Sequence, residues 1–179
     1  MRIAIGCDHA GFEWKEKVKA ILTKMGHEVI DFGTNSKESV DYPDFGLKVA
    51  HAVADGEVDY GMTVCWTGNG MNMAANKVKG IRAGLAVNPE MAHLTRLHNN
   101  ANVLTLSQKY TPEADLEEIV KQFVTTDFEG GRHLRRLLRL SPRPWGKAFR
   151  PARAWSTSRR HWESRWAGSI SRRGTNAAS

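Results

Sequence analysis

The residues of this chain with the clearest chemical potential lie in the segment 60–84. An apolar run typical of a buried strand ends at Cys65, and a loop with glycines at Gly68 and Gly70 leads into a predicted helix. Backbone N–H groups of such a turn, together with the unpaired donors of the helix's first turn, can bind an anion. The same positive potential favours the thiolate of Cys65, which is its reactive form. The segment therefore predicts an anion site with a reactive cysteine beside it.

The loop matches neither of the common phosphate-binding fingerprints. No Gly-Lys-Ser/Thr follows, as a Walker A motif requires, and Met73 stands where a dinucleotide fingerprint has its third glycine. A Gly-x-Gly turn alone is a weak indication of an anion site. The adjoining cysteine strengthens the prediction.

Strands and helices must alternate to position this loop, and the apolar pattern predicts that they do. The predicted strands are residues 3–7, 27–32, 58–65, 81–87 and 102–106. The predicted helices are a stretch ending at Gly26, residues 43–55, a stretch through Asn76, residues 89–98, and a helix opened by Thr111-Pro112. Repeated strand–helix units with short links predict an α/β fold, a three-layer α/β/α sandwich around a five-stranded parallel, Rossmann-like sheet.

Ligands of parallel sheets bind at the carboxyl ends of the strands. We expect residues 7–9 and 65–67 to meet there, joined by residues 98–99 around the helix that follows the fourth strand. A later segment begins a helix in which Arg132 and Arg136 stand at i and i+4, on one face. The sequence thus predicts a polar site at the carboxyl edge of the sheet.

Charge is distributed unevenly along the 179 residues, whose formal net charge is +7. Residues 1–140 hold 17 basic and 18 acidic side chains, whereas residues 141–179 hold nine basic side chains against Glu163 alone. The affinity for nucleic acid or an anionic membrane surface that a high pI suggests therefore attaches only to the tail. We predict one domain of residues 1–140 and a separate tail of residues 141–179.

The tail is rich in arginine, serine and tryptophan and has neither a helical nor a strand period. One interpretation is a basic, aromatic segment that binds nucleic acid through phosphate contacts and base stacking. The other, which we favour, is an unselected extension, such as a shifted reading frame or a cloning remnant, which would be disordered.

The rest of the composition points to an intracellular protein. Cys7 and Cys65 both end strand-like runs and do not form a secreted disulfide framework. The N-terminus enters a strand at once, without a signal-peptide pattern, and no apolar run approaches the roughly 18 residues of a membrane span. We expect a cytoplasmic protein with no membrane segment.

Five motifs over about residues 1–140, in order and in register, resemble those of a known family. They are GCDHAGF at the N-terminus, DYPDF at 41–45, CWTGNGMNMAANKVKGIRAG at 65–84, RLHNNANVL at 96–104 and EGGRH at 129–133. The chain resembles ribose-5-phosphate isomerase B, within the wider family of B-type ribose and galactose phosphate isomerases. This resemblance implies interconversion of ribose 5-phosphate and ribulose 5-phosphate through a cis-enediolate, with no metal or other cofactor.

The resemblance also implies a role for each candidate residue. Cys65 would be the general base, since Met71 stands where some members place a glutamate. His98 would serve the ring oxygen during ring opening, with Asp8 and Thr67 handling the sugar hydroxyl. The other candidates would bind the substrate or its phosphate; they are His9, Tyr42, Gly68, Asn69, Gly70, Asn99, Lys109, Arg132 and Arg136. Members of the family are homodimers, some pairing into tetramers, with the active site at the subunit interface, and we expect the same here.

Two positions depart from the family pattern. Trp66 stands where glycine is common, and its indole could reshape the mouth of the pocket. Lys109 stands where an arginine often contacts phosphate, so the charge is kept and the bidentate fork is lost. A six-carbon sugar phosphate, of the allose 6-phosphate or galactose 6-phosphate type, therefore stays open as substrate. A sugar-phosphate-binding protein without turnover is a further alternative.

Some candidates also have purely structural interpretations. Asp8 could cap the helix that follows it, and His98 could cap the last carbonyls of its own helix. Cys7 is better explained as a small buried apolar residue than as a partner of Cys65.

Overall fold

The computed structural model describes residues 1–140, and the predicted tail of residues 141–179 lies outside the described residues. The strands are β1 (Arg2–Cys7), β2 (Glu28–Asp31), β3 (Tyr60–Cys65), β4 (Ala83–Leu85) and β5 (Val103–Ser107). The helices are α1 (Phe12–Lys24), α2 (Tyr42–Ala54), α3 (Asn69–Asn76), α4 (Pro89–Asn99), α5 (Leu116–Thr125) and α6 (Gly131–Leu140), with short 3₁₀ turns η1 (His9–Gly11) and η2 (Glu113–Asp115).

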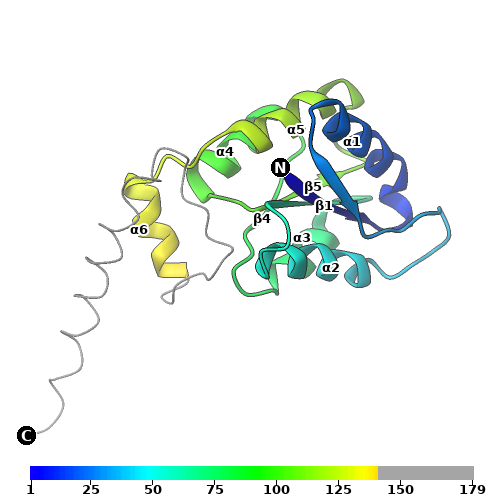
Figure 1. Ribbon diagram of the computed structural model, residues 1–179, viewed down its shortest axis with the longest axis horizontal. Coiled ribbons are helices and arrows are strands. Elements are labelled where there is room, and N and C mark those ends of the chain that lie inside the picture. The colour runs from blue at the N-terminus through cyan, green and yellow to red at the C-terminus, as the bar shows by residue number, and fades with distance from the viewer. Residues whose placement is uncertain (141–179) are drawn as a thin grey trace, which may run out of the picture. The chain divides into compact units, whose positions relative to one another are not determined.

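The five strands form one all-parallel sheet in the order β2-β1-β3-β5-β4. Helices α1, α4 and α5 cover one face of the sheet, and α2 and α3 cover the other (Figure 1). The predicted three-layer α/β/α sandwich with a five-stranded parallel sheet is confirmed.

The core is divided by the sheet into two apolar clusters. On the side of α1, α4 and α5, Leu22 and Phe123 pack against strand residues such as Met62. On the other side, Val53 of α2 packs with Val103 of β5. Because side chains alternate between the two faces of a strand, β1, β3 and β5 must be apolar at nearly every position, and they are buried along almost their whole length. These three strands are the rigid platform of the site.

Strand β4 is shorter than the predicted residues 81–87. It lies at the edge of the sheet and pairs only with β5. Polar side chains close its amino end: Asn102 Oδ1 accepts from the Arg82 backbone N–H at 2.7 Å, and Asn76 Oδ1 accepts from the Ala83 N–H at 2.9 Å.

Chain direction fixes which elements lie at which edge of the sheet. Since all strands are parallel, their carboxyl ends share one edge, and the helices run back toward the amino edge. Helix α4 therefore ends at the amino edge, where Asn100 adopts a left-handed conformation (φ 46°) and the chain enters β5 three residues later.

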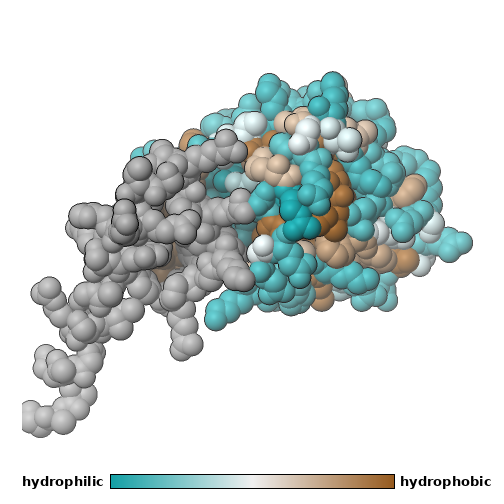
Figure 2. Space-filling model, in the orientation of Figure 1, coloured by the Kyte–Doolittle hydropathy of each residue, from teal (hydrophilic) through white to brown (hydrophobic). Residues whose placement is uncertain are grey.

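The surface of the described residues is mainly hydrophilic, with an apolar area near the centre of the face drawn in Figure 2. Within residues 1–140, no helix combines the length and the apolar character needed to cross a membrane.

Candidate functional site

The turn between β3 and α3 aims backbone donors at a cysteine sulfur. Gly68 has a left-handed conformation (φ 83°), which directs its N–H to Cys65 Sγ at 3.1 Å. A Cβ on Gly68 would also lie 2.3 Å from Leu85 Cδ1. The left-handed backbone conformation therefore favours glycine here, and a side chain would also force Leu85 to move. The predicted Gly-x-Gly turn at a helix N-terminus, with Cys65 at its start, is confirmed.

The segment after β1 packs directly against this turn. A Cβ on Gly11 would lie 2.5 Å from the Val64 carbonyl oxygen, so only glycine allows η1 to approach the end of β3 so closely. The Asp8 N–H donates to the same carbonyl at 3.3 Å, and the Asp8 carboxylate accepts from the Gly11 N–H at 2.9 Å. Asp8 is thus an N-cap, as its structural interpretation predicted, and it also lies beside Cys65.

Other predicted residues surround the turn. The Tyr42 ring packs against Gly70. A Cβ added to that glycine would lie 3.1 Å from Tyr42 Cζ. The Lys109 N–H donates to the Trp66 carbonyl at 3.0 Å, and the Lys109 ammonium lies 5.9 Å from the indole centroid. We call this set the carboxyl-edge group; it comprises Asp8, His9, Tyr42, Cys65, Trp66, Thr67, Gly68, Asn69, Gly70 and Lys109.

Hydrogen bonds orient two further members of the carboxyl-edge group. His9 Nδ1 accepts from the Val40 N–H at 3.2 Å, which fixes the plane of the imidazole. Thr67 Oγ1 accepts from the Asn69 N–H at 3.4 Å, at the entrance of α3.

Burial controls the protonation of Cys65, a residue that is only 4% exposed. Burial raises the pKa of the thiol above its ordinary value, and the nearby Asp8 charge adds to this, although N–H groups of Met71, Gly68 and Gly70 act in the opposite direction. The N–H groups of the turn thus act in the predicted direction, toward the thiolate, but burial outweighs them, and in the isolated chain Cys65 rests as a thiol. Burial likewise raises the pKa of Asp8.

A second set of residues, including the predicted His98, Asn99, Arg132 and Arg136, gathers where α4 ends and α6 begins. The rings of His98 and His133 stack at 4.3 Å between centroids, with 1° between their planes. Glu129 approaches both rings, and Arg132 Nε donates to His133 Nε2 at 3.1 Å. We call this set the α4–α6 cluster; it comprises His98, Asn99, Glu129, Arg132, His133 and Arg136.

The two sets lie at opposite edges of the sheet. Cys65 pairs with Ser107 at the end of β5, whereas Asn99 precedes the start of β5 at Val103. At about 3.3 Å per residue, the four steps of β5 alone separate the two sets by roughly 13 Å. The prediction that residues 98–99 lie at the carboxyl edge is wrong within one chain, because α4 runs antiparallel to the strands.

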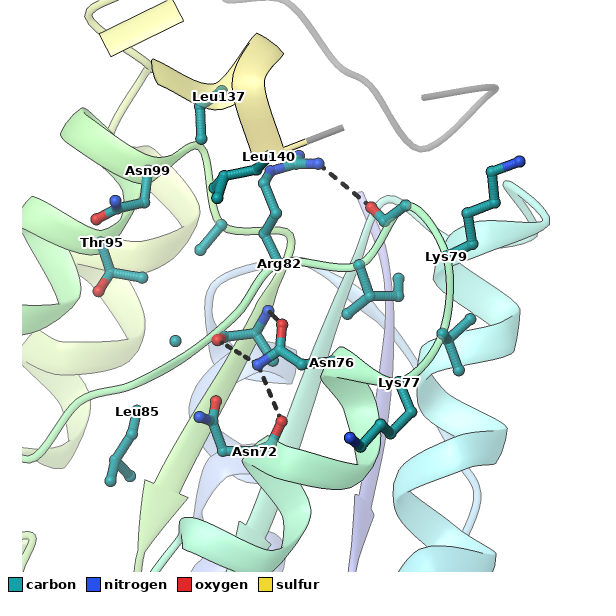
Figure 3. A pocket seen from close by; sticks show the side chains of 16 residues that line it. Asn72, Asn76, Lys77, Lys79, Arg82, Leu85, Thr95, Asn99, Leu137 and Leu140 are labelled. Atoms are coloured by element: carbon teal, nitrogen blue, oxygen red, sulfur yellow. Dashed lines mark hydrogen bonds between the residues drawn. The ribbon is translucent and has the colours of Figure 1, made fainter. Parts of the chain in front are cut away.

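A cavity of about 610 Å³ lies along the edge strand β4, between α3, α4 and α6 (Figure 3). Asn72 and Lys77 line it from α3 and the segment that follows, Arg82 from the start of β4, and Asn99 and Leu137 from α4 and α6. Asn72 Oδ1 is buried there without a hydrogen-bond partner within the described residues. Only Asn99 among these was predicted as a site residue.

Comparison with known proteins gives a consistent result. The profile of the family described as Ribose/Galactose Isomerase matches residues 3–140. Ribose-5-phosphate isomerase B of Escherichia coli is 46% identical over 136 residues, which are 76% of this chain and 91% of that protein. The probable ribose-5-phosphate isomerase B of Mycoplasma genitalium is 42% identical, over 75% of this chain and 90% of that one.

Solved structures agree in fold. Ribose-5-phosphate isomerase B of Clostridium thermocellum superposes with a TM-score of 0.78 at 48% identity, covering 79% of this chain and 96% of that one. The Mycoplasma genitalium enzyme, solved with bound ribulose 5-phosphate, gives 0.74 at 41% identity, over 78% and 93% of the two chains. On the profile match, the identities and the shared fold, this chain belongs to the ribose/galactose isomerase family.

Proposed function

We propose that this protein is a ribose-5-phosphate isomerase of the B type, which interconverts ribose 5-phosphate and ribulose 5-phosphate. One observation carries the proposal: N–H groups of the 68–71 turn point at Cys65 Sγ, and Asp8 lies beside it. This site occurs in a chain that shares 46% identity with an isomerase of that name. The related structure with bound ribulose 5-phosphate supports the choice of substrate.

Cys65 is the proposed general base. Its thiolate takes the C2 proton of the open-chain aldose, and the electrons of that C–H bond form the C1=C2 bond of a cis-enediolate while negative charge moves to O1. Transfer of the O2 proton to O1 moves the negative charge to O2. Return of the carbon-bound proton to C1, as the C2=O bond forms, then gives the ketose. Because Cys65 rests as a thiol, the thiolate is the minor form, and the converging N–H groups of Gly68 and Gly70 stabilise it once formed. The same donors and Thr67 can stabilise the enediolate oxygen.

Ring opening and phosphate binding are assigned to the residues that the resemblance implied. His98 protonates the ring oxygen, with Asp8 taking part at the hydroxyl. Arg132 and Arg136, exposed on one face of α6, bind the phosphate dianion. His9 and Lys109 add polar contacts from the carboxyl edge.

We further propose that the complete site forms between two copies of the chain. A five-carbon sugar phosphate is too short to reach from Cys65 at one edge of the sheet to Arg132 near the other. A two-fold dimer would place the α4–α6 cluster of each copy against the carboxyl-edge group of the other, giving two identical sites. Tyr42 and Trp66, 40% and 50% exposed at the rim, would then be partly covered.

An isomerase assay on five- and six-carbon aldose phosphates, run side by side, tests the proposed reaction. We expect turnover of ribose 5-phosphate and exchange of its C2 proton with solvent. A six-carbon substrate is the second candidate, which Trp66 at the pocket mouth leaves open, and preferential turnover of allose 6-phosphate would establish it. Binding of sugar phosphates without proton exchange would overturn the isomerase proposal in favour of a binding protein.

A further inference from the structure

His133 is the buried ionisable side chain at the centre of the α4–α6 cluster, and it was not among the predicted site residues. His133 is buried, whereas the neighbouring Arg132 and Arg136 face solvent. The Glu129 N–H donates to the Leu97 carbonyl at 2.9 Å, and this contact holds the start of α6 against the end of α4. The fold therefore presents His133 to His98.

The stack of His133 on His98 is nearly parallel, with 1° between the two ring planes and 4.3 Å between their centroids. Of the two stacked rings, that of His98 lies nearer to solvent, since its side chain is 33% exposed and that of His133 only 6%. A buried ring that packs flat on a half-exposed one restricts its rotation about χ2. The plane of the His98 ring is thus set by His133.

The second contact of His133 is a hydrogen bond that depends on its protonation. Arg132 Nε lies 3.1 Å from His133 Nε2, and Glu129 Oε2 lies 3.3 Å from the same nitrogen. An arginine only donates and a carboxylate only accepts, so Nε2 can satisfy one of them at a time. A neutral ring with its proton on Nδ1 accepts from Arg132, whereas a protonated ring donates to Glu129 and releases the arginine.

The surroundings favour the neutral ring. Burial lowers the pKa of His133 below its ordinary value, and the charges of His98, Arg132 and Arg136 lower it further, with only Glu129 opposing them. Arg136 Nη1 lies 3.5 Å from Nδ1, so a second guanidinium faces the ring.

The same arrangement bears on what the cluster can bind. The ligating atoms of His98, Glu129 and His133 lie within 4.8 Å of one another, a spacing that could hold a metal ion. Two guanidinium groups within 3.5 Å of the central imidazole disfavour a dication and favour an anion. We therefore assign the cluster to the substrate and its phosphate rather than to a metal.

We propose that His133 is a positioning residue that joins the ring-opening acid and the phosphate site into one unit. Its neutral ring fixes the plane of His98 by stacking and fixes Arg132 by accepting its Nε–H. This inference rests on the proposed function, in which His98 acts on the ring oxygen and Arg132 on the phosphate.

Two substitutions separate the two contacts. His133→Phe keeps a flat ring under His98 and removes the acceptor for Arg132, so KM for ribose 5-phosphate should rise about tenfold with kcat within about threefold of wild type. His133→Gln keeps an acceptor and removes the stack, so kcat on ribose 5-phosphate should fall about three- to tenfold with KM nearly unchanged. His93→Gln is the matched control, because His93 is a half-buried histidine that is hydrogen-bonded to Gln122 and Thr126, away from the cluster.

A second substrate tests the assignment to ring opening. Ribulose 5-phosphate cannot close a furanose ring because its O5 carries the phosphate. Exchange of its C1 proton with solvent in His133→Gln should therefore stay within about twofold of wild type, because orientation of a ring-opening acid contributes nothing to that step. An equal loss in exchange and in ribose 5-phosphate turnover would overturn the role through His98.

Titration of the histidine rings by NMR tests the inference without any activity. The pKa of His133 should rise in Arg132→Met, which removes a neighbouring positive charge, and fall in Glu129→Gln, which removes a negative one. If the wild-type protein shows no isomerase activity, the proposed function fails. The titration then decides by itself whether His133 interacts with Arg132 and Glu129 as inferred. A His133 resonance that responds to neither change, or Phe and Gln variants that lose kcat and KM equally along with thermal stability, would reduce His133 to a packing residue.

Discussion

The carboxyl-edge group and the α4–α6 cluster hold their functional groups by different means. At the carboxyl edge, backbone geometry does the positioning: glycines at 11 and 68 allow close approach, and N–H groups aim at Cys65 Sγ. In the α4–α6 cluster, side chains position one another through a ring stack and an arginine–histidine hydrogen bond.

The two regions also differ in burial and charge. Cys65 and Asp8 are buried, and the pKa of each is raised by that burial. Arg132 and Arg136 are exposed and cationic. Proton transfer benefits from a dry, rigid site, whereas capture of a dianion benefits from accessible charge. The two regions are therefore suited to different tasks: the carboxyl-edge group to proton transfer and the α4–α6 cluster to phosphate binding. Neither region has the features needed for both tasks.

The largest effect is expected from removing the sulfur. Cys65→Ala should lower kcat by about 10² to 10⁴, because no other ionisable group of the 66–71 turn can replace the base. Circular dichroism and thermal melting should show an intact fold. Cys7→Ala is the matched control: Cys7 also ends a central strand but is fully buried, so this variant should keep its turnover. Wild-type-like turnover by folded Cys65→Ala would contradict the assignment.

Loss of one arginine should be the next largest effect. Arg132→Ala and Arg136→Ala should each weaken sugar-phosphate binding by about 1.5–3 kcal/mol, or roughly ten- to more than a hundredfold. Arg135→Ala and Arg139→Ala are matched controls on the same helix, where both arginines are exposed outside the cluster. Calorimetric titration with inorganic phosphate separates the two pairs. Equal affinity in all four variants would remove the phosphate role from α6.

The raised pKa of Cys65 predicts a moderate effect of pH. The thiolate fraction should still be increasing as pH passes 9.0, so kcat/KM for proton exchange and the rate of alkylation by iodoacetamide should both keep rising there. Cys7, whose pKa burial raises to about 12, should react far more slowly. A plateau of both rates below pH 8 would show that the assembled protein depresses the pKa of Cys65.

The same shifts affect stability. A thiol whose folded pKa exceeds its unfolded value stabilises the fold below pH 9.0, and this contribution is lost as pH rises through the folded pKa. For Cys7 that window runs from about 9 to about 12. Cys7→Ala should therefore flatten the fall of melting temperature between those pH values, relative to wild type. An unchanged slope would indicate that other groups control alkaline unfolding.

The smallest effect is expected from the tail. Deleting residues 141–179 should leave turnover equal or higher and should shift the melting temperature by no more than about a degree or two. The described elements end at Leu140, and the family match ends at the same residue. The prediction falls outside the described residues and rests on composition. A truncation that loses activity or dissociates the assembly would contradict it.

Most of the fold follows from local patterns in the sequence. Buried runs such as residues 3–7 and 58–65 predicted the central strands, and Pro89 predicted the start of α4. The end residues of edge strand β4 could not be predicted in this way, because they depend on hydrogen bonds to the side chains of Asn76 and Asn102, which lie outside the strand.

The site could be predicted in part only. The turn after Cys65 was recognisable because its glycines and cysteine are contiguous. The place of His98 depends on the direction of α4, and the part played by His133 depends on contact between α6 and α4, which no periodicity indicates. The protonation of Cys65 depends on tertiary burial, which outweighs the local donors.

The measurement that tests the central claim most directly is complementation between two inactive variants. Cys65→Ala and the double variant Arg132→Ala/Arg136→Ala are unfolded together and refolded as a mixture, or co-expressed. If each site takes its sulfur from one copy and its arginines from the other, half of the randomly paired dimers contain one intact site of two. The mixture should then recover about a quarter of wild-type activity. Activity no higher than that of the separate variants, with mixed dimers demonstrated by mass spectrometry, would contradict a site shared between two copies.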